Sequence, residues 1–485
     1  MKTSRSAKVL ALSSGKGLTA IIALISLAVL SRILSMEQYA TYRQTILAYA
    51  FIAPLLSLGL PQALLYFLPT EKHRKRGLLI DNLLLLTITG MLFSIFLLSG
   101  GNQLLAWRFH NPELEETLKI FALYPIFMLP MGAIGACLVV QDRIKLLSVF
   151  NVLSRLFIVG LMITTCIIWK TASATIITEI ATVTICSLIA IFIMLSTIPK
   201  DSWAPKLSSM KSILQYSIPL GLASMIGMIS MQLDKFIVSS MCTLEEFSIF
   251  VNGAIEIPLI SIITGSISSV ILVDMRKLID DNNIPAALSL FNQAAVKSAT
   301  ILFPTMVFLF VTATPFLTLI FSDKYSDSVL PFRLYLLLIP VRIVVFGAAF
   351  MALGKSKLIL FRETVFIISN LVLSIILVNL FGYLGATIAT ITLIYLWGAV
   401  FNMNTLAKEF KCRFFETIPI RKIAKIFTFS LIPLPLMGTY LLYFQNHNYL
   451  VQMICLSAIY WPIIYIVFVK TKLFHMNDIF GNKTK

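Results

Sequence analysis

Fourteen long apolar stretches constrain the fold of this chain of 485 residues more than any other feature of its sequence. They lie near 15–35, 44–68, 77–98, 118–140, 146–168, 175–198, 213–240, 247–272, 298–321, 331–354, 359–380, 384–404, 425–444 and 449–469. A hydrocarbon core about 30 Å thick is crossed by about 20 helical residues, so each stretch is long enough to span it. Only 13% of the residues are charged and the mean hydropathy is +0.91. The sequence therefore predicts an all-α polytopic membrane protein with about 14 transmembrane helices.

Lysine and arginine are unevenly distributed among the connections between these stretches. They are frequent in every second connection, including residues 71–76 and 407–425, and in the C-terminal tail, but sparse in the others, such as 99–117. Because cytoplasmic segments carry the excess of basic residues, we expect both termini in the cytoplasm. The net charge of +17 then follows from topology and does not indicate a nucleic-acid partner.

Other common kinds of site are not indicated. The six cysteines are scattered without a Cys-x-x-Cys pair, and the four histidines lack ligand spacing, so we expect neither a metal nor a cofactor. The apolar run after the basic N-terminal leader has no small-x-small cleavage site and is expected to remain as the first helix.

A short motif occurs twice, 208 residues apart. Residues 37–42 are EQYATY and residues 245–250 are EEFSIF, with one acidic and two aromatic positions in register. Each copy follows the first helix of a block of six predicted helices. Because six crossings return the chain to its starting side, the two blocks share one orientation, as in transporters built from parallel repeats.

The N-terminal part also contains a series of motifs: a basic leader, a helix ending in LAVLSRIL, then SMEQYATYRQ, LLSLGLPQALLYFLP and the basic turn EKHRKRG. This series resembles the polysaccharide or O-antigen flippases of the multidrug, oligosaccharidyl-lipid and polysaccharide (MOP) exporter superfamily. The resemblance covers the whole chain in topology and is specific over residues 15–76. Where that family often has glycine before the turn tyrosine, this chain has Gln38.

The resemblance implies a V-shaped pair of six-helix lobes that moves a polyprenyl-diphosphate-linked oligosaccharide from the inner to the outer leaflet of a bacterial cytoplasmic membrane. The cargo would be an undecaprenyl-diphosphate-type lipid used for O-antigen, lipopolysaccharide or other surface polysaccharide. Besides membrane lipids, a polysaccharide polymerase is a candidate partner. The implied parts are an N-terminal lobe, a C-terminal lobe, a cytoplasmic interfacial linker, and two peripheral helices with the tail, at 1–199, 200–406, 407–424 and 425–485.

Two arginines lie deep inside predicted helices and are the main candidates for cargo binding. Arg155 is about nine residues into its helix and shares a face with Asn151, and Arg342 is about eleven residues into another helix beside Pro340. An intramembrane charge costs roughly 2.5–3.5 kcal/mol on insertion scales, so such a residue needs a partner or a lumen. An anionic diphosphate would be bound by fixed positive groups of this kind.

Polar residues on other predicted helices extend this candidate site. Asn252 and Glu256 form a stripe with Ser248 at intervals of four residues, which makes Asn252 a candidate cargo ligand and Glu256 a candidate ion-coupling residue. Asp234 is a second candidate for ion coupling. It follows Gly227 on a face of small residues, a pattern that favours close helix packing.

The segment after the first helix is predicted to form an external turn. Its tyrosines, Tyr39 and Tyr42, are expected at headgroup level as interfacial anchors. Arg32 lies near the outer end of the first helix, where it can snorkel to the surface or bind cargo at the outer mouth. We include it among the candidate cargo-binding residues.

Two alternatives to a flippase remain open. A multidrug-type exporter of organic cations needs acidic groups in its lumen, yet the first six helices carry only Asp81 and Glu179, which we place near helix edges. A polysaccharide polymerase or other assembly enzyme usually needs a substantial external loop for its catalytic residues. The longest external connection, 99–117, contains one histidine and no nucleophile motif, so no catalytic residue is assigned.

The predicted topology has a direct test by cysteine labelling in a variant that lacks the six native cysteines. We expect Lys72→Cys to be protected from a membrane-impermeant thiol reagent in intact cells, because residues 71–76 carry the basic excess of a cytoplasmic loop. A cysteine placed within 99–117 is the external control and should be labelled. Labelling of Lys72→Cys in intact cells would contradict the topology.

Overall fold

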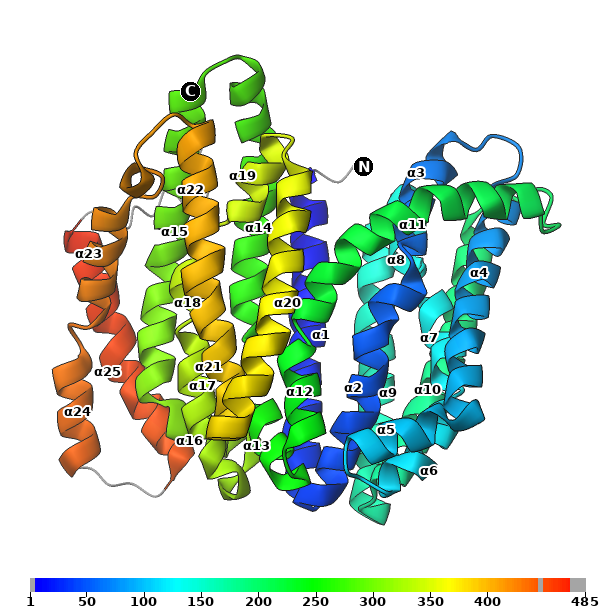
Figure 1. Cartoon of the computed structure of the whole chain (residues 1–485), viewed down its shortest axis with the longest axis horizontal. Helices are drawn as coiled ribbons and strands as arrows, with labels where there is room; N and C mark the ends of the chain where they lie inside the picture. The colour runs from blue at the N-terminus through cyan, green and yellow to red at the C-terminus, as the bar shows by residue number, and fades with distance from the viewer. Residues whose placement is uncertain (1–4, 444–447, 472–485) are drawn as a thin grey trace. The chain divides into compact units, whose positions relative to one another are not determined.

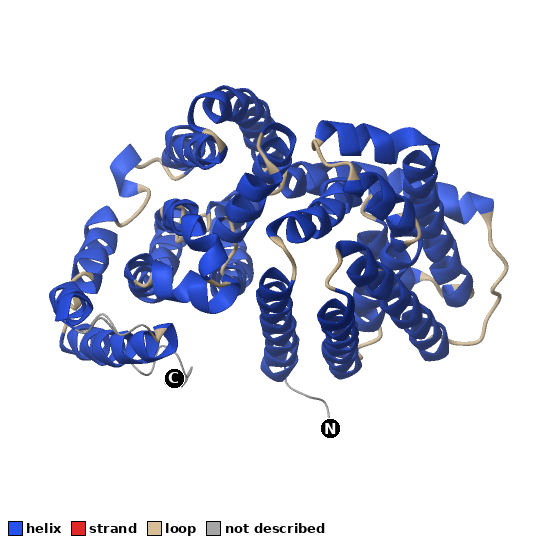
Figure 2. Ribbon diagram, turned by 90° about the horizontal axis from the view of Figure 1, so that it is seen from below, coloured by secondary structure: helices blue, strands red, loops and turns tan. Residues whose placement is uncertain are grey.

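The computed structural model describes residues 5–443 and 448–471, and these residues form helices and loops without a strand (Figure 2). Within them, 11 helices are long and apolar enough to cross a membrane, or up to 12 if the bent pair Glu113–Phe121 and Tyr124–Val140 is one span. Of the remaining expected spans, the first corresponds to the shorter apolar helix Gly17–Ile33 and the seventh is divided between two helices. The prediction of an all-α polytopic membrane protein is confirmed.

By its internal contacts the chain divides into two compact units, Met1–Ser248 with Val378–Ala386 and Ile249–Leu377 with Thr387–Lys485. The division into lobes at 1–199 and 200–406 stays a prediction. The first unit contains α1 (Arg5–Ile33), α2 (Met36–Ser57), α3 (Leu60–Thr70), α4 (Lys75–Phe96), α5 (Asn102–Arg108), α6 (Glu113–Phe121), α7 (Tyr124–Met131), α8 (Ile134–Val140), α9 (Ile144–Trp169), α10 (Ala172–Thr197), α11 (Leu207–Ser230) and α12 (Leu233–Met241). A π-helical segment, η1 (Leu97–Gly101), joins α4 to α5.

Helix α13 (Leu244–Gly253) crosses the boundary between the units. The second unit contains α14 (Pro258–Asp280), α15 (Ile284–Val311), α16 (Ala313–Phe321), α17 (Val329–Leu336), α18 (Ile339–Arg342), α19 (Phe346–Ala352), most of α20 (Ser356–Phe381) and of α21 (Tyr383–Leu393), α22 (Val400–Glu409), α23 (Ile420–Ser430), α24 (Leu434–Tyr443) and α25 (Tyr449–Lys470). The end of α20 and the start of α21, within Val378–Ala386, belong to the first unit. Shorter helical segments are η2 (Asp323–Ser328), η3 (Ile394–Ala399) and η4 (Phe414–Glu416). Within this unit α14 packs along α15 and α19, and α15 packs against α23 (Figure 1).

The first unit is held together by long helices that pack side by side. Helix α1 packs along α9, α9 along α10, and α4 along α7. A leucine-rich core lies among α3, α4 and α8, and Leu64, Leu79, Leu86 and Leu138 are buried in it. Leu79 and Leu86 are seven residues apart on α4 and so share the helix face that meets α3 and α8 in this core. This core fixes the helices that carry the polar residues described below.

The two copies of the repeated motif have the same local structure. Helix α2 begins after Ser35, whose hydroxyl accepts the N–H of Gln38 at 3.2 Å. In the second copy the hydroxyl of Thr243 accepts the N–H of Glu246 at 3.2 Å, so both motifs begin a helix behind a hydroxyl cap. The paired aromatic residues Tyr39 and Phe247 are both fully buried. The equivalence in sequence therefore extends to capping and burial.

This local structure corrects the expected external turn. The chain turns within the two residues between α1 and α2, and the tyrosines lie in the first turns of α2. Tyr39 is fully buried and Tyr42 is 6% exposed, so neither is an interfacial anchor. Their hydroxyl groups have protein partners: Tyr39 accepts from Arg43 at 2.7 Å and Tyr42 donates to a glutamate on α10. Polar partners inside the protein outweighed the headgroup position that the sequence indicated.

A close approach between α11 and the corner that joins α2 to α3 depends on two glycines. Gly59 has φ +69°, which glycine adopts without strain, and follows Leu58 in the same left-handed region. A Cβ on Gly221 of α11 would lie 2.3 Å from the carbonyl carbon of Leu58. At Gly227 nothing lies within 4 Å of a Cβ, so the close packing that the sequence placed there occurs at Gly221 instead.

The two glycines of α11 provide a matched test of this packing. We expect Gly221→Ala to destabilise the purified protein by about 1–3 kcal/mol, since the added methyl group has to displace backbone. Gly227→Ala should be neutral or stabilising by up to about 1 kcal/mol, because alanine favours helix and the site is open. Thermal unfolding in detergent measures both variants, and equal melting temperatures would contradict the close approach.

Candidate functional site

Arg155 and Glu179 form the centre of a polar site in the first unit. Arg155 is half-buried on α9, and Glu179 is 6% exposed on α10, the helix that packs along α9. The guanidinium of Arg155 interacts electrostatically with the Glu179 carboxylate. The hydroxyl of Tyr42 donates a hydrogen bond of 3.0 Å to Oε2 of Glu179. An acidic group, a basic group and a phenol thus meet inside one helical bundle.

Aromatic residues surround this polar centre. The hydroxyl of Tyr42 also lies 3.5 Å from the sulfur of Met162 on α9. Tyr124 of α7 interacts electrostatically with Glu179, and its ring stacks on Phe121 with centroids 4.5 Å apart. Tyr49 meets the Tyr124 ring edge-on at 5.2 Å. These residues form an aromatic cluster beside the buried Glu179 carboxylate.

A second charged pair lies in the other unit. Arg342 Nη2 lies 2.9 Å from Oε1 of Glu256, and the two side chains are 38% and 43% exposed. Both residues occupy breaks in the helical path. Glu256 lies in the non-helical segment between α13 and α14, so the expected stripe with Ser248 and Asn252 does not continue along one helix.

The helix expected around Arg342 is divided into α17, α18 and α19. Pro340 lies in α18, which is four residues long and ends at Arg342. The break before α18 leaves the carbonyl of Leu337 to accept a hydrogen bond of 2.6 Å from the Tyr395 hydroxyl. Irregular backbone within a membrane span is tolerated where protein or a water-filled cavity satisfies its polar groups. The break therefore presents Arg342 from a short, supported segment.

The other predicted site residues are distributed over several helices. Asn151 is half-buried on α9, one turn before Arg155. Arg32 is exposed in the last turn of α1, and Asn252 is fully buried in the last turn of α13. Asp234 is 6% exposed in the first turn of α12, where Oδ1 accepts the N–H of Lys235 at 2.8 Å. Their roles in cargo binding or ion coupling stay predictions.

Glu179 was placed near a helix edge by the sequence, and the structure corrects this. It is the eighth residue of α10, about 10 Å from the helix start, and is buried. Its isolation in the apolar run ATIITEIATV was the available signal, because a lone intramembrane carboxylate is itself a functional indicator. Its partner Tyr42 lies 137 residues earlier, a distance at which spacing carries no information.

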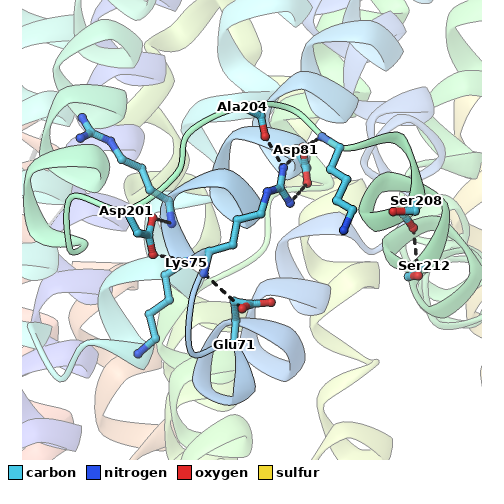
Figure 3. A network of polar contacts seen from close by, with 10 residues as sticks. Glu71, Lys75, Asp81, Asp201, Ala204, Ser208 and Ser212 are labelled. Atoms are coloured by element: carbon cyan, nitrogen blue, oxygen red, sulfur yellow. Dashed lines mark hydrogen bonds and ion pairs between the residues drawn. The ribbon is translucent and has the colours of Figure 1, made fainter.

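A separate polar network joins the loop before α4 to the linker between α10 and α11 (Figure 3). Arg74 makes a bidentate ion pair with Asp81 at 2.8 and 3.1 Å, and the Asp81 side chain is fully buried. This hydrogen-bonded pair raises the pKa of Arg74. Oδ1 of Asp81 also accepts the N–H of Lys206 at 3.0 Å, so the linker is held at the same carboxylate.

The linker in turn caps α4. Asp201 accepts the backbone N–H groups of Lys75 and Arg76 at 2.7 and 2.9 Å, at the first two residues of the helix. A carboxylate at this position satisfies otherwise unpaired N–H groups and is stabilised by the helix dipole. In the loop itself, the N–H of His73 donates to Glu71 at 3.0 Å and lowers the pKa of that carboxyl group. The network therefore anchors the linker to α4.

The fold is similar to that of the structure described as lipid II flippase MurJ in an inward closed conformation, with a TM-score of 0.76 and 17% identity over 95% of this chain and 99% of that one. It is also similar to an inward-facing multidrug resistance MATE family transporter of the MOP superfamily, with a TM-score of 0.61, 13% identity and coverage of 86% and 98%. A MOP superfamily transporter from Pyrococcus furiosus matches with a TM-score of 0.58, 13% identity and coverage of 84% and 96%.

These matches show that the chain shares its fold with these solved transporters. Residues 29–330 match the family model described as polysaccharide biosynthesis protein, and the chain belongs to that family. A search of curated proteins finds no match. The resemblance drawn from the N-terminal motifs is confirmed at the level of the family.

The network of Figure 3 predicts unequal costs for removing two ion-paired aspartates. We expect Asp81→Ala to destabilise the protein by about 3–5 kcal/mol, since it leaves the Arg74 guanidinium and the Lys206 N–H without their buried acceptor. Asp280→Ala removes an exposed carboxylate paired with Arg276 at 2.7 Å and should cost at most about 1 kcal/mol. Melting temperatures in detergent compare the two, and equal losses would contradict an anchoring role for Asp81.

Proposed function

We propose that the chain is a flippase that moves a polyprenyl-diphosphate-linked oligosaccharide from the inner to the outer leaflet of the bacterial cytoplasmic membrane, by alternating access. In this proposal the cargo is of the undecaprenyl-diphosphate type and serves O-antigen, lipopolysaccharide or related surface polysaccharide. Both termini lie in the cytoplasm, and the protein moves the lipid without changing it chemically. The observation that carries the proposal is membership of a polysaccharide biosynthesis family in a chain whose fold is that of MOP transporters.

The charge of the interior supports an anionic cargo. Arg155 and Arg342 are each within a predicted span, and each is only half-buried, which leaves guanidinium surface for a ligand. A guanidinium matches phosphate oxygens with paired, charge-assisted hydrogen bonds. The solved flippase of similar fold is described as acting on lipid II, and this also favours a lipid-linked cargo.

A deletion strain of the source organism tests the direction of transport. We expect loss of the surface polymer together with accumulation of its lipid-linked unit on the cytoplasmic side. External accumulation of unpolymerised units would instead indicate a polymerase, and an intact surface polymer would contradict the proposed function. Extraction of lipid-linked sugars followed by glycan analysis distinguishes these outcomes.

The two arginines should be needed for transport. We expect Arg155→Ala and Arg342→Ala to reduce surface polymer at least about tenfold, and the lysine variants to retain part of it because they keep charge but lose the bidentate geometry. Arg276→Ala is the control, since Arg276 is exposed and pairs with Asp280 on its own helix. Immunoblots verify protein levels. Wild-type polymer from both alanine variants at normal levels would contradict a cargo role.

A further inference from the structure

The acidic residues buried in α4 and α10 are stabilised in different ways. Asp81 is held by a bidentate ion pair with Arg74. Glu179 instead accepts a hydrogen bond from a neutral group, the Tyr42 hydroxyl, at 3.0 Å. Since a buried carboxylate without a direct ion pair is costly, proton uptake is an accessible way for Glu179 to lose its charge.

The guanidinium of Arg155 is not occupied by a direct bond to the Glu179 carboxylate. Arg155 interacts electrostatically with Glu179, but within the described part of the chain no side chain forms a hydrogen bond or close ion pair with its guanidinium. The five N–H donors of Arg155 are thus available to an anion. The two opposite charges balance each other at long range while the arginine keeps its ligand-binding geometry.

Among the charged side chains described on the helices packed against α10, Arg155 is the one that acts on Glu179. On α2, Arg43 donates to the Tyr39 hydroxyl at 2.7 Å and Glu37 is exposed, and on α9 Lys145 is exposed. The ionisable side chains that interact with Glu179 are Tyr42 of α2, Arg155 of α9 and Tyr124 of α7. Helix α8 contributes Cys137, which accepts a hydrogen bond from Gln141. On α6 the charged side chains are half-buried or exposed to the outside: Glu113, Glu115, Glu116 and Lys119. Arg155 is therefore the cation that sets the charge balance at Glu179.

We propose that Glu179 is a proton-binding site linked to the binding of a diphosphate at Arg155. This inference rests on the proposed function. In the empty protein the Glu179 carboxylate balances the Arg155 guanidinium. When a diphosphate engages the guanidinium, its negative charge acts on the carboxylate, and Glu179 takes one proton from solvent to become the neutral acid. The anionic headgroup and the proton enter together, which lowers the net charge added to the interior.

The linkage fixes the direction of the pH dependence. Because the bound state holds one more proton than the empty state, diphosphate binding strengthens as pH falls through the range where Glu179 changes charge. For one linked proton the slope approaches tenfold in Kd per pH unit. Above this range Glu179 stays ionised in both states, and the pH dependence from this residue disappears.

The full-length protein in detergent, titrated with geranylgeranyl diphosphate, tests the proposal. Calorimetry in two buffers of different ionisation enthalpy counts the protons taken up per diphosphate bound. We expect wild type to take up about one proton more than Glu179→Gln, in which the slope of Kd against pH is correspondingly smaller. Glu115→Gln alters an exposed glutamate paired with Lys119 and should behave as wild type. The difference between variants removes any proton exchanged by the diphosphate itself.

Infrared difference spectra provide a second readout that does not depend on the proton count. Diphosphate binding should create a carboxylic-acid C=O band that is absent from Glu179→Gln and shifted in Tyr42→Phe, since the phenol donates to this carboxyl group. Tyr42→Phe also keeps the proposal testable if the glutamine variant does not fold.

The outcomes separate this inference from the function on which it rests. If wild type binds the diphosphate with the same proton count and pH slope as Glu179→Gln, or if the band is present before binding, Glu179 is not a linked site and the proposal is overturned. The proposed function would stand in either case. If wild type fails to bind geranylgeranyl diphosphate at any pH, the diphosphate cargo and the linked proton site both fail.

Discussion

The free-energy cost of placing a charge in hydrocarbon governs how the charged side chains of this chain are paired. Three carboxylates in or beside the spans have compensating arrangements that differ in strength. Asp81 is neutralised by a bidentate guanidinium, Glu256 pairs with Arg342 at 2.9 Å, and Glu179 has a phenol and a more distant arginine. The tight pair at Asp81 anchors a linker, whereas the looser arrangements leave arginine donors available. The bidentate pairing of Asp81 with Arg74 therefore suits an anchor, whereas Arg155 and Arg342, which keep unpaired N–H donors, are suited to ligand binding.

The chain's composition determines the spans almost directly, because a helix of sufficient length and hydropathy has few alternatives in a membrane. All fourteen predicted stretches correspond to helical segments, although the fourth is bent by 49° and the seventh is divided between α11 and α12. The breaks were harder to predict. Pro340 indicated one, but the non-helical segment around Glu256 had no such signal. It follows Gly253, where a Cβ would lie 2.6 Å from Cγ of Pro331, a close approach that local sequence does not indicate.

The partners of polar residues could not be predicted, because they depend on which helices become neighbours. Tyr42 is of a residue type that is typical of interfacial anchors, and it lies near the end of a span. Its hydroxyl nevertheless donates to Glu179, on a helix far along the chain. Gly227 and Gly221 lie on the same helix, and local sequence does not distinguish them. Only the approach of the α2–α3 corner makes Gly221 the close contact. Sequence thus identified the residue types needed for a site and left their pairing to tertiary structure.

The two copies of the repeated motif share one local structure but differ in a polar side chain. Ser35 and Thr243 cap equivalent helices, and Tyr39 and Phe247 are both fully buried, so the framework is the same. Three residues further along, the first copy has Tyr42 and the second has Phe250, which is buried without a hydroxyl group. Phenylalanine cannot donate to a carboxylate, and the acidic partner of the second unit, Glu256, instead pairs directly with an arginine. The first copy thus supplies the hydroxyl group that donates to the buried carboxylate of Glu179, whereas in the second unit the 43% exposed carboxylate of Glu256 pairs with a cation.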